Sequence, residues 1–343
     1  MARSQALKPS IESCEKPATT IRMAAASMSA PESTSGRWDS TYHAPVLADE
    51  VVALFAGARS VLDGTLGGGG HSLALLNIGA EVTAIDRDPQ AISAAKARLA
   101  DYENAGRFRT VLGNYADLDA VPALDGVLFD GILLDLGVSS HQLDDPSRGF
   151  SFREGVPLDM RMGTDAARDA ATLLMTADEV ELAAIFREYA DERRAMRLAR
   201  EIVRRRGNRP FETSDDLVGA IRGALGPRTG PGDFARLFQA VRIAVNDEIG
   251  GLERALDSLR QRLRPGGTFA VIAYHSGEDR VAKNAFRDWS AECICPPRQP
   301  ICTCRGHALG SLVTRKSVTA SPDEASRNPR SRSARLRAWR SAP

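Results

Sequence analysis

The sequence predicts an α/β fold in which a mostly parallel β-sheet is interrupted by an all-helical insertion. Short apolar strands alternate with helices from about residue 43 to residue 136, which is the rhythm of right-handed β–α–β crossovers. Between residues 146 and 244 only helical periodicity remains, and an apolar strand returns at residues 268–274. A chain of 343 residues is long enough for two domains, or for one large domain that carries such an insertion.

Composition excludes several classes of protein. Apolar residues make up 43% of the chain and charged residues 26%, which excludes a wholly disordered chain. No apolar run approaches the roughly 18 residues that a membrane-spanning helix needs, so we expect no membrane contact. Five cysteines, an odd number in a chain of this length, argue against a secreted disulfide framework and indicate the cytoplasm.

The first half of the chain is expected to contain an arm and then the first strands of the sheet. Residues 1–40 are rich in Ser, Ala, Thr and Pro without sustained periodicity, and are predicted to be disordered. Order is expected to begin at His43. Apolar spacing then predicts helices at 45–55, 71–78 and 89–102, and strands at 60–63, 81–86, 108–112 and 126–136. Asp130 and Gly131 are expected to shorten the last of these strands.

The helical block separates the two halves of the sheet. Helical spacing is clearest at residues 180–189, 193–206 and 214–225, and a further helix ends at Leu263 before a Pro-Gly-Gly turn. Strands are then predicted at 268–274, 312–316 and 335–340. We therefore expect a discontinuous sheet domain, residues 41–145 and 245–343, and a helical substrate-recognition insertion, residues 146–244.

The densest chemical signal is a glycine-rich stretch after the first strand, residues 63–71 (Asp-Gly-Thr-Leu-Gly-Gly-Gly-Gly-His). Glycines between a strand and a helix let the backbone turn tightly and let a ligand approach it closely. Asp86 ends the next strand, where a carboxylate can accept both hydroxyls of a ribose. Together these features predict a Rossmann-like sheet that binds an adenosine-type cofactor.

An acid before the first glycine helps to choose among such cofactors. A negative side chain at Asp63 repels the pyrophosphate of a dinucleotide and favours a cation. The ammonium and sulfonium of S-adenosylmethionine are such cations, so we predict a methyl donor. Tyr115, just past the third strand, either stacks on the adenine or packs within its own loop.

Two arginine-rich blocks suggest RNA. Residues 193–209 contain eight arginines and one acid, Glu201. One helical face carries Arg193, Arg197, Arg200 and Arg204, whereas the opposite face carries Ala195, Leu198, Ala199, Ile202 and Val203. Such a face either contacts phosphates or is merely solvated. Residues 327–340 contain six arginines and no acid, with Trp339 as a stacking or core residue.

Four cysteines form two C-x-C pairs, Cys293 with Cys295 and Cys302 with Cys304. Paired thiols resemble metal ligands, yet this spacing is tighter than the C-x₂₋₄-C of zinc sites. A structural zinc and reduced thiols in a Pro-rich loop both remain open. We therefore assign no metal ligand from the sequence.

These features resemble the MraW/RsmH family, the bacterial enzymes that methylate N4 of a cytosine in 16S ribosomal RNA with S-adenosyl-L-methionine. The resemblance runs in order from about residue 42 to residue 340. It rests on residues 43–50, 63–65, 69–72, 84–91, 130–140, 148–152, 157–162, 238–243, 275–280 and 328–333.

The resemblance implies a methyltransferase sheet, a cofactor site and a substrate. Carried over by position, the cofactor contacts fall on Gly69, Gly70, His71, Asp86, Tyr115, Asp135 and Gln142. The implied partner is 16S rRNA, in its decoding region, within the small ribosomal subunit or a late assembly intermediate. Two other hypotheses remain, a methyltransferase for a small molecule or protein and a non-catalytic RNA-binding factor.

The chemistry of amine methylation points to the ends of two strands. Asp135, at the end of the fourth strand, is placed to hold the donor's amino group, the cytosine amine, or both. His275-Ser276 follows the fifth strand. This pair is either a helix cap, with Ser276 as N-cap and Asp279 at N3, or a contact to the base. We assign no catalytic residue from the sequence.

Overall fold

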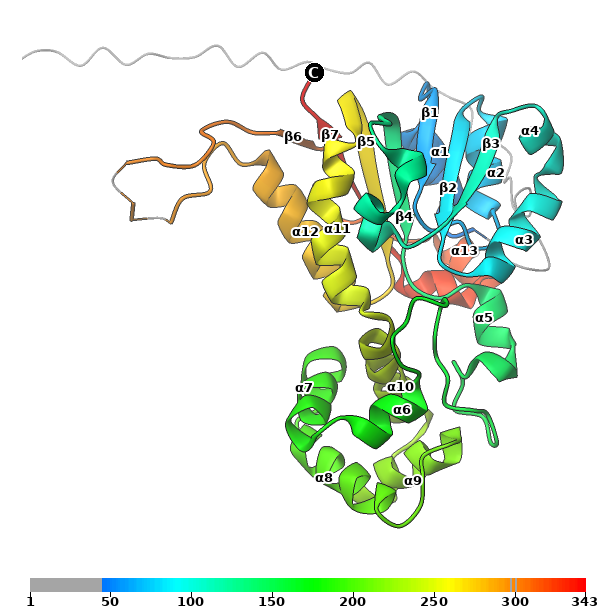
Figure 1. Ribbon diagram of the computed structural model, residues 1–343. Helices are drawn as coiled ribbons and strands as arrows, with labels where there is room; N and C mark the ends of the chain where they lie inside the picture. The colour runs from blue at the N-terminus through cyan, green and yellow to red at the C-terminus, as the bar shows by residue number, and fades with distance from the viewer. Residues whose placement is uncertain (1–44, 297, 300) are drawn as a thin grey trace, which may run out of the picture. The chain divides into compact units, whose positions relative to one another are not determined.

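The computed structural model describes residues 45–296, 298–299 and 301–343 (Figure 1), so the predicted disordered arm, residues 1–40, lies outside the described residues. Within the described residues, a seven-stranded sheet has the order β3-β2-β1-β4-β5-β7-β6. The strands are β1 Ser60–Asp63, β2 Glu81–Asp86, β3 Phe108–Leu112, β4 Phe129–Asp135, β5 Leu263–Ala273, β6 Gly310–Leu312 and β7 Arg335–Ser341.

The pairing confirms the predicted Rossmann-like α/β class. Strands β1 to β5 are parallel to one another, and crossovers with helices join β1 to β2 and β2 to β3. Strand β7 is antiparallel to both β5 and β6 and lies between them. The order of the strands reverses at β1, so β1 and β4 end beside a crevice at the carboxyl edge of the sheet.

Two apolar layers cover the two faces of the sheet. One face packs on α1 (Ala48–Leu54), α2 (Gly70–Asn77) and α3 (Pro89–Arg98). The other face packs on α11 (Glu248–Gln261) and α12 (Ser276–Ser290), which lie side by side in Figure 1, and on the 3₁₀ turns η1 (Tyr115–Ala120) and η2 (Pro122–Leu124). Successive residues of β4, such as Leu133 and Leu134, alternate between these layers, as the pleat requires.

Between β4 and β5 the chain forms a group of helices with an apolar core of its own. This core is built from α6 to α10 and includes Phe186, Leu198 and Leu237. The helices are α6 Ala170–Thr176, α7 Glu179–Ala190, α8 Ala195–Arg206, α9 Ser214–Leu225 and α10 Pro231–Asn246. The short elements α5 (Ser140–Asp144) and η3 (Pro146–Arg148) precede them. Among the described helices, none has both the length and the apolar character to cross a membrane.

Strand β4 is shorter than the predicted 126–136, but it runs through Asp130 and Gly131, and its pairing with β5 shifts register between Phe129 and Gly131. The carboxylate of Asp130 accepts hydrogen bonds from the backbone N–H groups of Arg59 and Ser60. Gly131 has no side chain, and the ring of Phe55 occupies the space where one would lie. A Cβ at Gly131 would come within 2.4 Å of that ring. The glycine therefore marks a close approach of α1's end to the sheet.

Other predicted elements also have different bounds. The helix expected at 89–102 is divided at Leu99 into α3 and α4 (Ala100–Asn104). The strand expected at 312–316 ends at Leu312, because the N–H groups of Val313 and Thr314 both bond to the carbonyl of Ala338. That bulge ends the regular pairing. The last elements, α13 (Pro322–Arg327) and η4 (Pro329–Ser333), lead into β7.

Gly131→Ala should lower the free energy of unfolding by about 1–3 kcal/mol, because the added methyl group forces the buried Phe55 ring to move. Gly232→Ala is the matched control. It makes the same chemical change in α10, where nothing lies within 4 Å of the new Cβ. Chemical denaturation followed by circular dichroism would compare the two variants. Equal stability of both would show that Phe55 does not restrict this site.

Candidate functional site

A cavity of about 380 Å³ opens at the carboxyl ends of β1, β2 and β4. Its other wall comes from the helical group, through residues 165–168 and the junction of α10 with α11. Six of the seven residues expected to contact a cofactor line it. They are Gly70, His71, Asp86, Tyr115, Asp135 and Gln142. The structure therefore brings six of the seven residues together around one cavity.

Gly69, the seventh residue, does not line the cavity. It is the N-cap of α2 with a φ of 73°, in the left-handed region that favours glycine. A Cβ there would lie 3.2 Å from the Leu99 side chain and 3.4 Å from that of Ala95. Gly69 therefore allows α2 and α3 to pack closely, which is a structural role.

Most backbone N–H groups of the glycine loop are already bonded within the protein. Gly64 and Leu66 donate to the carbonyls of Leu133 and Ile85, and Gly69 donates to Leu66. Thr65 donates to Asp63 and Gly67 donates to Asp86, at 3.2 and 2.7 Å. A phosphate-binding loop needs such groups free to face the ligand. This loop uses them to hold two carboxylates.

Asp86 is held as a hydrogen-bond acceptor at the end of β2. Its Oδ2 accepts from the Gly67 N–H and its Oδ1 accepts from the Asp88 N–H at 2.9 Å. Each oxygen keeps a further lone pair for a ligand hydroxyl. Burial raises the pKa of Asp86 to about 6, against the opposing effect of the two N–H bonds.

Asp63, which the sequence suggested would face a cationic ligand, does not line the cavity. Its carboxylate is 1% exposed, accepts from Ser72 Oγ at 2.7 Å and so ties the end of β1 to α2. Burial raises its pKa despite these bonds. Asp63 therefore supports the cavity wall by holding Thr65, and other carboxylates line the cavity.

His71, Asp135 and Tyr274 form a polar group at the ends of β4 and β5. Asp135 Oδ1 accepts from the Tyr274 hydroxyl at 2.8 Å, and Oδ2 lies 3.3 Å from His71 Nε2. Burial alone would lower the pKa of His71, but Asp135 and Asp63 outweigh it and raise that pKa. Burial, followed by the charge of Asp135, raises the pKa of Tyr274. The phenol therefore stays protonated and donates a hydrogen bond to Asp135.

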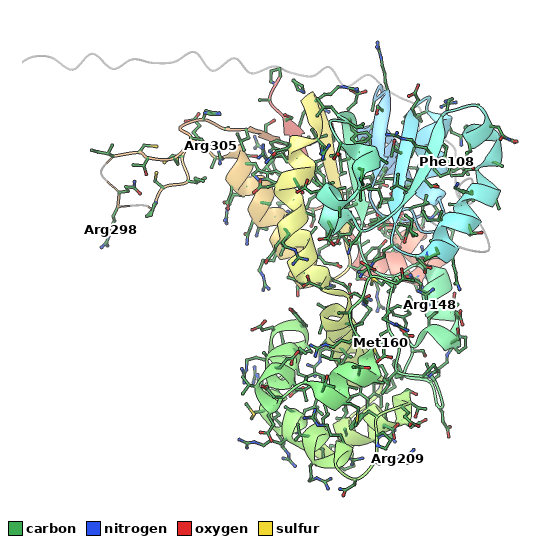
Figure 2. All side chains as sticks on the ribbon, viewed as in Figure 1. Phe108, Arg148, Met160, Arg209, Arg298 and Arg305 are labelled. Carbon is green, nitrogen blue, oxygen red and sulfur yellow. The ribbon has the colours of Figure 1, made fainter. Side chains whose placement is uncertain are left out.

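Gln142 lines the cavity, but its side-chain amide forms hydrogen bonds with other groups of the protein. Its Nε2 donates to Asp88 Oδ2 at 3.0 Å and to the Met162 carbonyl at 3.3 Å, and its Oε1 accepts from the Ser139 N–H. Arg148 donates to the same Asp88 oxygen at 2.8 Å and to the same Met162 carbonyl. Figure 2 labels Arg148 where the sheet meets the helical group.

Sequence reasoning missed the residues that hold the opposite wall. Asn246, at the end of α10, donates to the Met160 carbonyl at 2.7 Å and accepts from the Met162 N–H at 2.8 Å. Next to it, Glu248 forms two 2.8 Å hydrogen bonds with Arg242 and lines the cavity. The only signal was that Arg242 lies in residues 238–243, one of the stretches that carry the family resemblance.

Tyr115 lies where either of the alternatives that the sequence left open is possible. It lines the cavity, and it packs against the core formed by η1, α11 and α12. Burial, together with the carboxylates of Glu278 and Glu248, raises its pKa. A neutral ring is therefore available to a planar ligand.

The predicted cap at the start of α12 is wrong in its residues. His275 is the N-cap, and its Nδ1 accepts from the Glu278 N–H at 3.4 Å. In turn, the Glu278 carboxylate accepts hydrogen bonds from the N–H groups of Tyr274 and His275. Ser276 is the first helical residue, and Asp279 instead pairs with Arg337 at 2.7 Å. His275 does not line the cavity, whereas the buried Glu278 does.

The arginine face predicted on α8 is confirmed as an exposed surface. Its arginines are exposed, and the opposite face is buried at Leu198, Ala199 and Ile202. Two of its members have acidic neighbours, since Arg204 bonds to Glu201 at 2.8 Å and Arg200 lies 3.5 Å from Glu179.

Five of the six arginines in the second block are exposed, and Arg337 is half-buried. Arg337 pairs with Asp279, Arg330 pairs with Asp144, and Trp339 is fully buried in the core. Stacking by Trp339 on a ligand is therefore excluded.

The charge around the cavity favours a cationic ligand. Carboxylates outnumber guanidinium groups among the lining residues, and a crevice lined by one sign of charge concentrates ligands of the other. The lining acids are Asp86, Asp117, Asp135, Asp165, Asp247, Glu248 and Glu278, and the lining arginines are Arg87, Arg168 and Arg254.

Comparisons with known proteins place these features in one family. A model of the MraW methylase family matches residues 40–342. The chain is 64% identical over 314 residues to the ribosomal RNA small subunit methyltransferase H of Gemmatimonas aurantiaca, covering 92% of this chain and 98% of that protein. It is 44% identical over 307 residues to the protein of the same name from Heliobacterium modesticaldum, covering 87% and 97%.

Arg148→Leu should lower the free energy of unfolding by about 3–5 kcal/mol, because it leaves the Asp88 carboxylate, 2% exposed, without its charged partner. Arg153→Leu, at an exposed arginine of the same segment, should change it by less than about 0.5 kcal/mol. Denaturant titration of both variants measures the difference. A small loss in Arg148→Leu would mean that Gln142 alone compensates Asp88.

Proposed function

The chain belongs to the MraW methylase family, and we propose that it transfers the methyl group of S-adenosyl-L-methionine to N4 of a cytosine in the decoding region of 16S rRNA. The observation that carries this proposal is the cavity at the ends of β1, β2 and β4. Its glycine loop bonds to carboxylates and its lining is acidic, as a cationic donor requires. The substrate is the small ribosomal subunit or a late assembly intermediate, met in the cytoplasm.

The residues around the cavity fit the donor at three points. Asp86, Tyr115 and Asp135 line the cavity, where they would accept the two ribose hydroxyls, stack on the adenine and attract the ammonium group, respectively. Gly70 and His71 line the wall at the start of α2. When bound, the donor supplies a methyl group on a sulfonium, a good leaving group. The chain must then supply mainly alignment and close approach.

Asp135 is also the best-placed acceptor for a proton of the cytosine amine. The amine's lone pair is delocalised into the ring, and an acceptor for its N–H turns that lone pair toward the methyl group. Tyr274 and His71 hold the Asp135 carboxylate from its two oxygens and fix its direction. With the donor bound, its sulfur would leave as a neutral thioether with the electron pair of the broken carbon–sulfur bond, the new carbon–nitrogen bond would form, and Asp135 would accept the proton that nitrogen loses.

The helical insertion, residues 146–244, is the surface that we propose for the RNA. It supplies one wall of the cavity, and the exposed arginine face of α8 lies on it. Among the described residues, no ion pair holds Arg193 or Arg197, so both remain available for phosphates. Arg206 is different, since it donates to the carbonyls of Leu174 and Ala177 and holds α6.

The decisive experiment is methylation in vitro with an isotope-labelled donor. The protein is offered free 16S rRNA, small subunits and assembly intermediates from a strain without the gene. Nuclease digestion and mass spectrometry then identify the modified nucleotide. N4-methylcytosine at a single position supports the proposal, and label on another base, or on protein only, overturns it.

Asp86→Asn should weaken donor binding by about 1.5–3 kcal/mol, the range for a hydrogen bond to a charged group. The ionised carboxylate is the form that accepts two hydroxyls. With a pKa of about 6, wild-type affinity should therefore fall as the pH drops through 6. Isothermal titration calorimetry between pH 5 and pH 8 measures both effects.

The Asp86→Asn curve isolates this titration from other groups, because asparagine does not ionise. The donor affinity of this variant should not show the fall near pH 6 that the wild type shows. Parallel curves for the two proteins would contradict the ribose assignment. The folded state of the variant is checked by circular dichroism.

Replacing Arg197, Arg200 and Arg204 together with glutamine should weaken binding of the ribosomal substrate and leave donor affinity unchanged. Each lost phosphate contact should reduce the slope of log affinity against log salt by about 0.7–0.9. Arg287→Gln, an exposed arginine of α12, should leave the slope as in the wild type. If the curves of the triple variant and the wild type overlapped across the salt series, the RNA would not bind at the arginine face of α8.

A further inference from the structure

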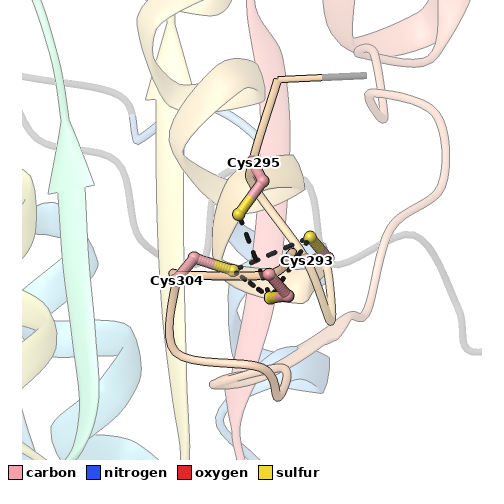
Figure 3. A group of neighbouring side chains, drawn as sticks. Cys293, Cys295 and Cys304 are labelled. Carbon is pink, nitrogen blue, oxygen red and sulfur yellow. Dashed lines mark hydrogen bonds between the residues drawn. The ribbon is translucent and has the colours of Figure 1, made fainter. Parts of the chain in front are cut away.

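The loop between α12 and β6 carries four cysteines whose sulfur atoms converge on one point (Figure 3). Sγ–Sγ distances are 3.7 Å for Cys293–Cys302, 3.9 Å for Cys295–Cys302, 3.5 Å for Cys302–Cys304 and 3.7 Å for Cys293–Cys304. All four sulfur atoms lie within 4.8 Å of one another. None of these residues lines the cavity, so the cluster is separate from the proposed methylation site.

These distances match the edges of a tetrahedron around a metal ion. A zinc–sulfur bond is about 2.3 Å, which places the sulfur atoms of a four-cysteine site about 3.8 Å apart. A disulfide needs about 2.05 Å. Cys302 lies at nearly equal distances from three other sulfur atoms, whereas two disulfides would divide the four into pairs.

We propose that Cys293, Cys295, Cys302 and Cys304 bind one zinc ion as a structural four-thiolate site. Zinc takes four tetrahedral thiolate ligands in such sites and leaves no open position for substrate. The tight C-x-C spacing, which argued against zinc in the sequence, does not prevent convergence, because the turn at residues 302–304 places its two sulfur atoms 3.5 Å apart.

Backbone groups of each C-x-C turn support the sulfur atoms of the other turn. The Ile294 N–H donates to Cys304 Sγ, and the Thr303 N–H donates to Cys295 Sγ, both at 3.4 Å. Such donors lower the charge on thiolates that bind a metal and orient them. The two turns are therefore interlocked around the point that the metal would occupy.

Among its described residues, the loop is otherwise held mainly by hydrogen bonds, such as those that Gln299 donates to Ile301 and Thr303. Its described isoleucines, Ile294 and Ile301, are 51% and 74% exposed. Arg305 closes the base of the loop by donating to the carbonyls of Asp288 and Ala291. Figure 2 places Arg298 at the far end of the loop, away from the sheet. Without an apolar core in this segment, metal binding would supply the folding free energy.

The first test measures metal content by plasma mass spectrometry on the full-length protein, purified with a thiol reductant and without chelators. We expect about one zinc per chain in the wild type and almost none in the Cys293→Ser/Cys302→Ser variant. Cys14→Ser is the matched control, since it removes the one cysteine outside the cluster and should keep the zinc. This readout is independent of methyl transfer.

The second test needs no variant and reports the ligands directly. A mercurial reagent added stepwise to the wild type should release one zinc as four thiols react, and cobalt in place of zinc should give the absorption of tetrahedral thiolate coordination. Metal-free protein that takes up no zinc, or disulfides among these cysteines, would overturn the proposal. Zinc retained by the Cys293→Ser/Cys302→Ser variant would also overturn it and would point to Glu248, His275 and Glu278.

Discussion

One buried carboxylate, that of Asp88, joins the sheet to the start of the helical insertion. Its Oδ1 accepts from the Gln90 N–H and caps α3, and its Oδ2 accepts from Gln142 and Arg148. A carboxylate removed from water loses several kcal/mol of solvation, which these hydrogen bonds and the positive charge of Arg148 offset. Asp88 therefore joins α3, α5 and the start of the insertion at one point, two residues beyond Asp86.

The proposed chemistry follows from how the backbone donors are used. Asp88 donates its own N–H to Asp86, and Gly67 donates to the other oxygen of that carboxylate. The glycine loop therefore uses the N–H of Gly67 to bind the Asp86 carboxylate, and this group is not free to bind a phosphate. On the opposite wall, Asn246 ties the end of α10 to residues 160–162. Both ends of the insertion are thus fixed around an acidic cavity.

Features confined to one strand–loop–helix unit could be predicted from the sequence. Asp86 follows from a strand end that lies close to the glycine-rich stretch, whereas His71 was implied by the family resemblance, and both residues line the cavity. The partner of Asp135 could not be predicted, because Tyr274 lies 139 positions away and its hydroxyl has no sequence signature. The sequence also could not predict where the Asp63 side chain points, because an acid at a strand end can face a ligand or a serine equally well.

The position of the insertion also has a consequence for folding kinetics. Strands β4 and β5 are neighbours, yet the whole insertion separates them, so their pairing closes a long loop at an entropic cost that grows with loop length. The insertion has its own core, and Asn246 bonds to Met160 near its other end. An insertion that folds early brings β4 and β5 together and shortens the effective loop. The sheet would then be completed in a step whose rate depends on helices that it does not contain.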